Sequence, residues 1–201
     1  VGMAEYPDKY FDLAIVDPPY GIGMDGRNNF SGAKHTKKEW DNITPDKQYW
    51  IELFRVSKNQ IVWGMNYFDL PPTKSFICWY KRPFYKEVAE CELAWSSFNV
   101  PAKVFDYLYA GNCEGLNGKA KVDYTKKSIH PTQKPVALYD WIYSQFAKDS
   151  NFILDTHLGS GSSRIAAYKG GFNFVGFEID QEYYEKQEKR FNDFKSQLRM
   201  F

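Results

Sequence analysis

The 201-residue sequence has few side chains that bind metals or form disulfides. No pair among them has the spacing of zinc ligands or of a Cys-x-x-Cys motif; they are Cys78, Cys91, Cys113, His35, His130 and His157. We therefore expect no metal site. An odd, sparse cysteine count is also typical of proteins in a reducing cytoplasm.

The sequence also lacks an excess of charge and any long apolar run. The formal net charge is +1, so no basic surface typical of nucleic-acid-binding domains is visible in the composition, and such a surface must be local. No apolar run approaches the length that crosses a membrane. Residues Val1–Glu5 do not form a charged and apolar signal segment. We expect a cytoplasmic protein with no membrane attachment.

The order of apolar segments predicts the fold class. With 43% hydrophobic residues, the chain can form one domain over residues 1–201. We expect strands at 11–16, 60–63, 75–80, 91–95, 151–154 and 174–177. One helix is expected from residue 45 to 57, with Thr44 as its N-cap. Further helices are expected at 135–147, 162–169 and 181–198. This alternation predicts an α/β domain with a largely parallel sheet.

Three predicted strands end in an acidic residue: Asp17, Asp155 and Glu178. Ligands of parallel sheets bind beyond the carboxyl ends of the strands. We therefore expect these three carboxylates at one edge of the sheet.

Residues 155–162, which read Asp-Thr-His-Leu-Gly-Ser-Gly-Ser, lie between a strand and a helix. Glycines in such a loop let the backbone approach a ligand closely. Glu178 follows about 23 residues after Asp155, and a carboxylate at that distance commonly accepts hydrogen bonds from both hydroxyls of a ribose. An acid before the glycines suits a ligand that carries a cation. S-adenosylmethionine has an ammonium, a sulfonium and a ribose.

Other interpretations of this loop are weaker. A nicotinamide cofactor is disfavoured because Arg164 stands where the Gly-x-Gly-x-x-Gly motif has its third glycine. A P-loop is excluded, since no glycine precedes Lys-Ser or Lys-Thr at the required spacing. A tight turn capped by Ser162, without a ligand, stays open.

The segment Asp17-Pro18-Pro19-Tyr20 suits chemistry on a base amine. An exocyclic amine is a poor nucleophile because its lone pair is delocalised into the ring. A carboxylate at Asp17 and the Pro18 carbonyl could accept its two hydrogens, and consecutive prolines would fix that carbonyl. Tyr20 offers a flat face for an extruded base. The alternative is a rigid proline turn with Asp17 as a cap.

Together these segments resemble the DNA amino-methyltransferases of the permuted β group, whose Asp-Pro-Pro-Tyr motif precedes the cofactor motif. The segment from His130 to Pro135 is similar to the family segment beside the methionine end of the cofactor. The resemblance implies a circularly permuted, Rossmann-like methyltransferase fold with helices on both sheet faces. It implies catalytic residues Asp17, Pro18, Pro19 and Tyr20. It implies that S-adenosylmethionine is bound by Asp155, Thr156, Leu158, Gly159, Ser160, Gly161, Ser162, Glu178, Ile179, Thr132 and Lys134.

By family pattern the substrate is double-stranded DNA and the target is the N6 of adenine, with the N4 of cytosine as the alternative. A homodimer and a place in restriction-modification are further expectations. RNA and protein glutamine methyltransferases are disfavoured because they usually have Asn in place of Asp17 and the cofactor motif first. A non-catalytic binding subunit with the same fold stays open.

Two segments are candidates for contact with DNA. Residues 98–130 form a small insert, the candidate target-recognition region, with Lys103, Lys119, Lys121, Lys126 and Lys127 against Asp106, Glu114 and Asp123. Residues 21–41 carry Arg27, Lys34, Lys37 and Lys38 and could close over the base. The family usually has one more short strand before residues 7–10, and we expect this chain to lack it.

Overall fold

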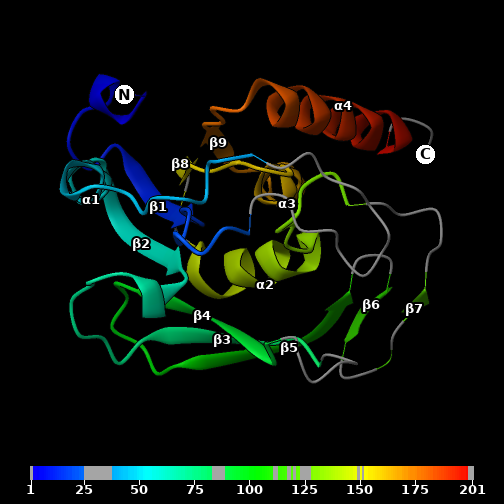
Figure 1. Cartoon of the computed structure of the whole chain (residues 1–201), viewed down its shortest axis with the longest axis horizontal. Coiled ribbons are helices and arrows are strands. Elements are labelled where there is room, and N and C mark those ends of the chain that lie inside the picture. Colours follow the sequence, from blue (N-terminus) through cyan, green and yellow to red (C-terminus); the bar gives the residue numbers. More distant parts are fainter. Residues whose placement is uncertain are drawn as a thin grey trace.

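A mixed sheet runs through the molecule and carries helices on both faces (Figure 1). The computed structural model describes residues 2–24, 38–82, 89–110, 113–116, 119, 121–122, 128–148, 150 and 152–198. Within them the strands are β1 (Phe11–Val16), β2 (Ser57–Trp63), β3 (Phe76–Tyr80), β4 (Cys91–Ser96), β5 (Lys103–Ala110), β6 (Cys113–Leu116), β7 (Lys121–Val122), β8 (Phe152–Asp155) and β9 (Asn173–Gly176). The helices are α1 (Lys47–Val56), α2 (Val136–Phe146), α3 (Ser162–Gly170) and α4 (Gln181–Leu198), with short 3-10 turns η1 (Gly2–Glu5) and η2 (Met65–Tyr67).

The strand order is β7-β6-β5-β3-β4-β2-β1-β8-β9. Strands β2, β1, β8 and β9 are parallel neighbours. On the other side, β4 runs antiparallel to both β2 and β3, β5 is parallel to β3, and β6 and β7 are antiparallel. The parallel part contains the three strands that end next to Asp17, Asp155 and Glu178. Their carboxyl ends therefore lie at one edge, as predicted.

Alternating side chains of β1 supply both layers of the core. Leu13 and Ile15 pack with α2 on one face, and Ala14 and Val16 pack with α1 and η1 on the other. Such burial of both faces is typical of parallel strands and explains why β1 reads as a mostly apolar run.

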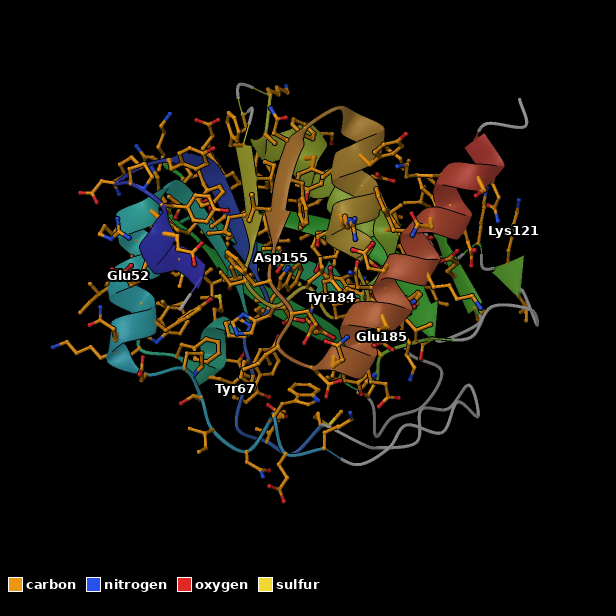
Figure 2. All side chains as sticks on the ribbon, turned by 90° about the horizontal axis from the view of Figure 1, so that it is seen from above. Glu52, Tyr67, Lys121, Asp155, Tyr184 and Glu185 are labelled. Atoms are coloured by element: carbon orange, nitrogen blue, oxygen red, sulfur yellow. The ribbon has the colours of Figure 1, made fainter. Side chains whose placement is uncertain are left out.

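Helix α4 forms the outer layer beyond α3. Figure 2 shows it alongside α3, with Tyr184 and Glu185 labelled on it. The guanidinium of Arg164 on α3 lies 4.0 Å from the ring centre of Phe191 on α4, and Tyr168 packs edge-on against the same ring. The charged sequence of α4 thus has one apolar face, which explains its amphipathic pattern.

Two local predictions were wrong. Helix α1 is capped by Asp46 rather than Thr44, because the Asp46 carboxylate accepts a hydrogen bond from the Tyr49 amide at 2.8 Å. Strand β2 begins at Ser57, directly after this helix and three residues earlier than expected.

The segment 98–130, expected to be a small insert, contributes strands β5 to β7 to the sheet. In β5 the buried Phe105 and Tyr107 alternate with the exposed Val104 and the partly exposed Asp106. This alternation is the sequence signal of a strand. The acidic Asp106 faces away from the core and forms an ion pair with Arg82.

Candidate active site

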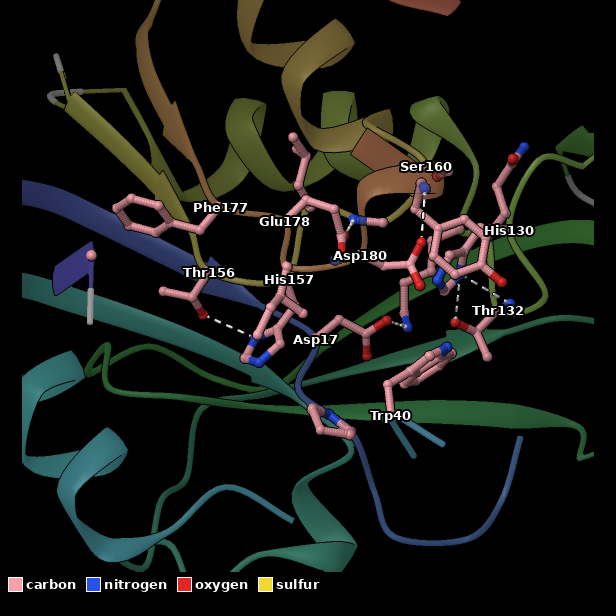
Figure 3. A pocket seen from close by; sticks show the side chains of 18 of the residues that line it. Asp17, Trp40, His130, Thr132, Thr156, His157, Ser160, Phe177, Glu178 and Asp180 are labelled. Carbon is pink, nitrogen blue, oxygen red and sulfur yellow. Dashed lines mark hydrogen bonds and ion pairs between the residues drawn. The ribbon is translucent and has the colours of Figure 1, made fainter. Parts of the chain in front are cut away.

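A cavity of about 490 Å³ opens at the carboxyl ends of β1, β8 and β9 (Figure 3). The predicted site residues that line it are Asp17, Pro19, Thr132, Lys134, Thr156, Leu158, Gly159, Ser160, Glu178 and Ile179. Those that do not line it are Pro18, Tyr20, Asp155, Gly161 and Ser162. Its size is within the usual range for a small-molecule site. The tertiary structure therefore brings together the two motifs at the start and the end of the chain.

Glycines shape the turn between β8 and α3. Gly159 has φ +51° and Gly161 has φ +71°, values that favour glycine. Gly161 is the N-cap of α3, and no side chain caps this helix. Ser162 therefore does not cap this turn; its hydroxyl donates to the Lys134 carbonyl at 2.7 Å instead.

Asp155 lies beneath this turn and is 2% exposed. Its carboxylate accepts from the His157 amide at 3.0 Å and from the Ser163 hydroxyl. Burial raises its pKa to about 7. Asp155 thus holds the turn between β8 and α3 from behind and does not line the cavity.

Glu178 lies at the cavity wall. Its Oε2 accepts from the Gly159 amide at 2.7 Å and its Oε1 from the Asp180 amide at 2.9 Å. Burial raises the pKa of this carboxyl. Each oxygen uses one of its lone pairs in these contacts, so both can still accept from a ligand hydroxyl.

Asp17 belongs to a row of alternating charges. Lys134 is 5% exposed and forms ion pairs with Asp17 and, at 3.3 Å, with Glu92 of β4. Lys81 lies 3.0 Å from the other oxygen of Glu92. Burial disfavours the charged form of Lys134, but the two carboxylates raise its pKa above the ordinary value. Burial likewise opposes ionisation of Glu92, yet Lys134 and Lys81 lower its pKa to about 2. Glu92 had no signal in the sequence.

Tyr20 is fixed on three sides. Its hydroxyl donates to Asp17 at 2.6 Å, and its ring stacks on Tyr67 with centres 4.7 Å apart and planes at 12°. A side chain at Gly64 would meet the Tyr20 ring at 2.3 Å, so only glycine leaves room for it there. Burial and the charge of Asp17 raise the pKa of Tyr20 well above its ordinary value, which keeps the hydroxyl a donor.

Aromatic and histidine side chains complete the cavity. His157 belongs to the motif at residues 155–162, and His130 and Gln133 belong to the expected segment from His130 to Pro135. The lining residues outside the sequence motifs are Gly2, Met3, Trp40, Tyr49, Tyr139, Phe177, Asp180 and Tyr183. His130 packs between Trp40 and Tyr183, with ring centres 5.3 and 4.3 Å away. Burial lowers the pKa of His157 to about 4, so this imidazole is neutral near pH 7. The chain has many aromatic residues, and their spacing did not distinguish these.

The two segments expected to face DNA are described only in part. Arg27, Lys34, Lys37, Lys126, Lys127 and Asp123 lie outside the described residues. Lys38 forms ion pairs with Asp180 at 2.8 Å and Glu182 at 2.9 Å. This lysine is thus tied to the start of α4.

The described residues contain neither a metal-ligand cluster nor a membrane-spanning helix. No group of three or more His, Cys, Asp or Glu side chains in this part of the chain could hold a metal ion. No described helix combines the length and apolar character needed to cross a membrane.

Comparison with known proteins gives consistent matches. A family model described as DNA methylase matches residues 49–189. The type II methyltransferase M2.LlaDCHI of Lactococcus lactis subsp. cremoris is 26% identical over 225 residues, which covers 90% of this chain and 82% of the relative.

Solved structures match as well. The complex of M1.HpyAVI with SAM has a TM-score of 0.55 at 21% identity and covers 90% of both chains. The PvuII DNA methyltransferase (cytosine-N4-specific) has a TM-score of 0.56 at 12% identity, over 94% of this chain and 82% of that one. At these identities the likeness concerns the fold alone, and it confirms the predicted fold class.

Proposed function

Because the chain belongs to the DNA methylase family, whose model matches residues 49–189, we propose that it transfers a methyl group from S-adenosylmethionine to an exocyclic amine of a base in double-stranded DNA. One observation carries this proposal. Asp17 of the catalytic motif lines the same cavity as Gly159 and Glu178 of the cofactor motif. A relative named as a type II methyltransferase supports a role in site-specific DNA modification.

The residues of the cavity fit S-adenosylmethionine. The free lone pairs of Glu178 suit the two ribose hydroxyls, and Gly159 leaves the backbone open to a ligand. Ile179, which is 97% exposed at the cavity mouth, and Phe177 offer apolar surface for the adenine ring. Thr132 and Ser160 lie with Thr156 and Leu158 around the remaining volume, where the amino-acid end would be held. When bound, this cofactor supplies an electrophilic methyl group on a positively charged sulfur.

The chain itself prepares the target nitrogen. The Asp17 carboxylate and the Pro18 carbonyl accept the two hydrogens of the amine, which leaves the nitrogen lone pair available. Both oxygens of Asp17 already accept one bond each, from Tyr20 and from Lys134, and each retains a further lone pair. These two partners fix the orientation of the carboxylate before the base arrives, so the rate gain comes from preorganisation.

We propose adenine N6 as the target and the permuted β group as the place of this chain within the family. The order of the motifs supports the group: β1, which leads into Asp17, precedes β8 in the chain and pairs with it in the sheet. Asp in the first position of the motif supports adenine. The DNA methylase family covers both amines, so methylation of cytosine N4 is the second candidate.

Labelled S-adenosylmethionine and DNA test the activity, and analysis of the modified nucleoside identifies the base. We expect N6-methyladenine from the parent chain. Asp17→Ala should abolish transfer but retain the fold and cofactor binding, whereas Asp8→Ala, at an exposed carboxylate, should retain activity. Near-normal turnover in Asp17→Ala would contradict the role of this carboxylate.

Absence of cofactor binding in calorimetry would instead favour a non-catalytic binding subunit. Size-exclusion chromatography with light scattering tests the expected homodimer.

A further inference from the structure

Asp41 binds the backbone of the segment that follows the catalytic motif. Its side chain is buried, with 2% exposure. Its Oδ1 accepts from the amides of Tyr20 at 2.6 Å and Gly21 at 3.0 Å, and its Oδ2 accepts from the Met24 amide at 2.7 Å. The Asp41 carbonyl accepts from the Gly23 amide at 3.1 Å. One residue thus satisfies four backbone donors of a segment without regular structure.

The local backbone explains why a carboxylate is needed there. Residues 18–24 belong to no helix or strand, so their amides have no ladder partners and require other acceptors. Gly21 and Gly23 have φ of +73° and +67°, which turns successive amides toward a common point. A charged acceptor in such a concavity makes stronger hydrogen bonds than a neutral one.

The position of Tyr20 depends on this contact. Pro18 and Pro19 restrict the chain ahead of Tyr20, but Gly21 behind it has no side chain to limit its rotation. The hydrogen bonds that the Tyr20 and Gly21 amides donate to Asp41 remove that freedom. Fixing the Tyr20 backbone fixes where its hydroxyl meets Asp17.

Asp41 is itself held against the cofactor cavity by its neighbours. Trp40 lines that cavity and packs on His130. Lys38 is tied to Asp180 and Glu182 at the start of α4. Asp41 therefore connects the cofactor side of the cavity to the catalytic segment.

We infer that Asp41 is a positioning residue for methyl transfer, which acts through Tyr20 on the orientation of Asp17. This inference rests on the proposed function. It assigns to Asp41 a role in turnover beyond its contribution to folding.

Three variants test the role: Asp41→Ala, Asp41→Asn and the control Asp46→Asn, which retains a capping side chain on the exposed start of α1. Asparagine can keep the bonds to Tyr20 and Gly21 through its oxygen, but its amino group then faces the Met24 amide. We therefore expect a graded loss. If the reacting groups shift by about 1 Å, kcat of Asp41→Ala falls by about 100-fold, with a smaller fall for Asp41→Asn and none for Asp46→Asn. The Kd for S-adenosylmethionine should stay within about threefold, since none of the removed contacts involves residues 155–162.

Rates are measured well below the melting temperature of each variant, so that a purely structural role would leave kcat unchanged. Amide hydrogen exchange provides a readout independent of activity. In Asp41→Ala the amides of Tyr20, Gly21 and Met24 should exchange faster while those of β1 stay protected. Unchanged exchange at these amides, or faster exchange with near-parental kcat, would overturn the inference. A loss of cofactor affinity equal to the loss in kcat would also overturn it. If the parent chain has no transferase activity, the proposed function itself is refuted. That outcome is distinguishable from one in which only the predictions for the Asp41 variants are contradicted.

Discussion

Replacing Lys134 with methionine tests whether the row of charges at Asp17 stabilises the fold. The substitution keeps most of the apolar stem but removes the cation between Asp17 and Glu92. Removing one partner of a buried ion pair costs about 3–5 kcal/mol because the other charge is left unpaired. Asp17 and Glu92 are 18% and 29% exposed, so water compensates in part. We therefore expect a loss of about 3 kcal/mol, at the lower end of that range.

The matched control is Lys169→Met. Lys169 pairs with Asp140 at the surface, with side-chain exposures of 43% and 35%. Exposed pairs contribute about 0–1 kcal/mol, so this variant should lose little stability. Urea unfolding of both variants at pH 7 measures the difference in the free energy of unfolding.

Acid gives a second signature of the same interaction. The folded-state pKa of Glu92 is depressed to about 2, so its stabilising contribution is present above its unfolded pKa and is lost as the pH falls through the folded value. Without Lys134 that depression shrinks, and the parent and the variant should converge in stability between pH 4.5 and 2. If Lys134→Met costs no more than Lys169→Met at pH 7, the ion pairs of Lys134 do not stabilise the fold and our reasoning is wrong.

Two further substitutions have matched or internal controls. Gly64→Ala and Gly171→Ala both place alanine at a φ of +73° to +74°, which costs about 1–2 kcal/mol in backbone strain. Only at Gly64 would the new Cβ clash with a ring, because it would lie 2.3 Å from the Tyr20 side chain. Transferase assays should therefore show a loss confined to Gly64→Ala; equal activity would contradict the packing argument. The folded-state pKa of Asp155 is raised to about 7, so the folded state retains a proton that the unfolded state releases near pH 4. The free energy of unfolding should therefore fall by up to about 4 kcal/mol as the pH rises from 4 to 7. In Asp155→Asn the free energy of unfolding should become less dependent on pH between pH 5 and 7.5. An unchanged pH dependence would show that another group causes it.

The sequence alone determined the parts of the site that depend on local geometry. Two local patterns each predict a strand and the turn that follows it. One is the apolar run that ends in Asp17 and two prolines, and the other is the run that ends in Asp155 before a glycine turn. Parallel pairing then places the ends of such strands at one edge, and Glu178 follows by the same rule. These features were predictable because φ restrictions and strand periodicity act over a few residues.

Only the tertiary structure decided how the charges and aromatic rings are paired. Lys134 lies 117 residues from Asp17 in the chain, and its second partner Glu92 comes from a strand with no motif of its own. The sequence pattern placed Lys134 with the cofactor, whereas folding directs its ammonium to two carboxylates. It likewise brings Asp41 to the amides of Tyr20 and Gly21. A single carboxylate gives no periodic signal, because what it binds depends on which distant backbone approaches it during folding.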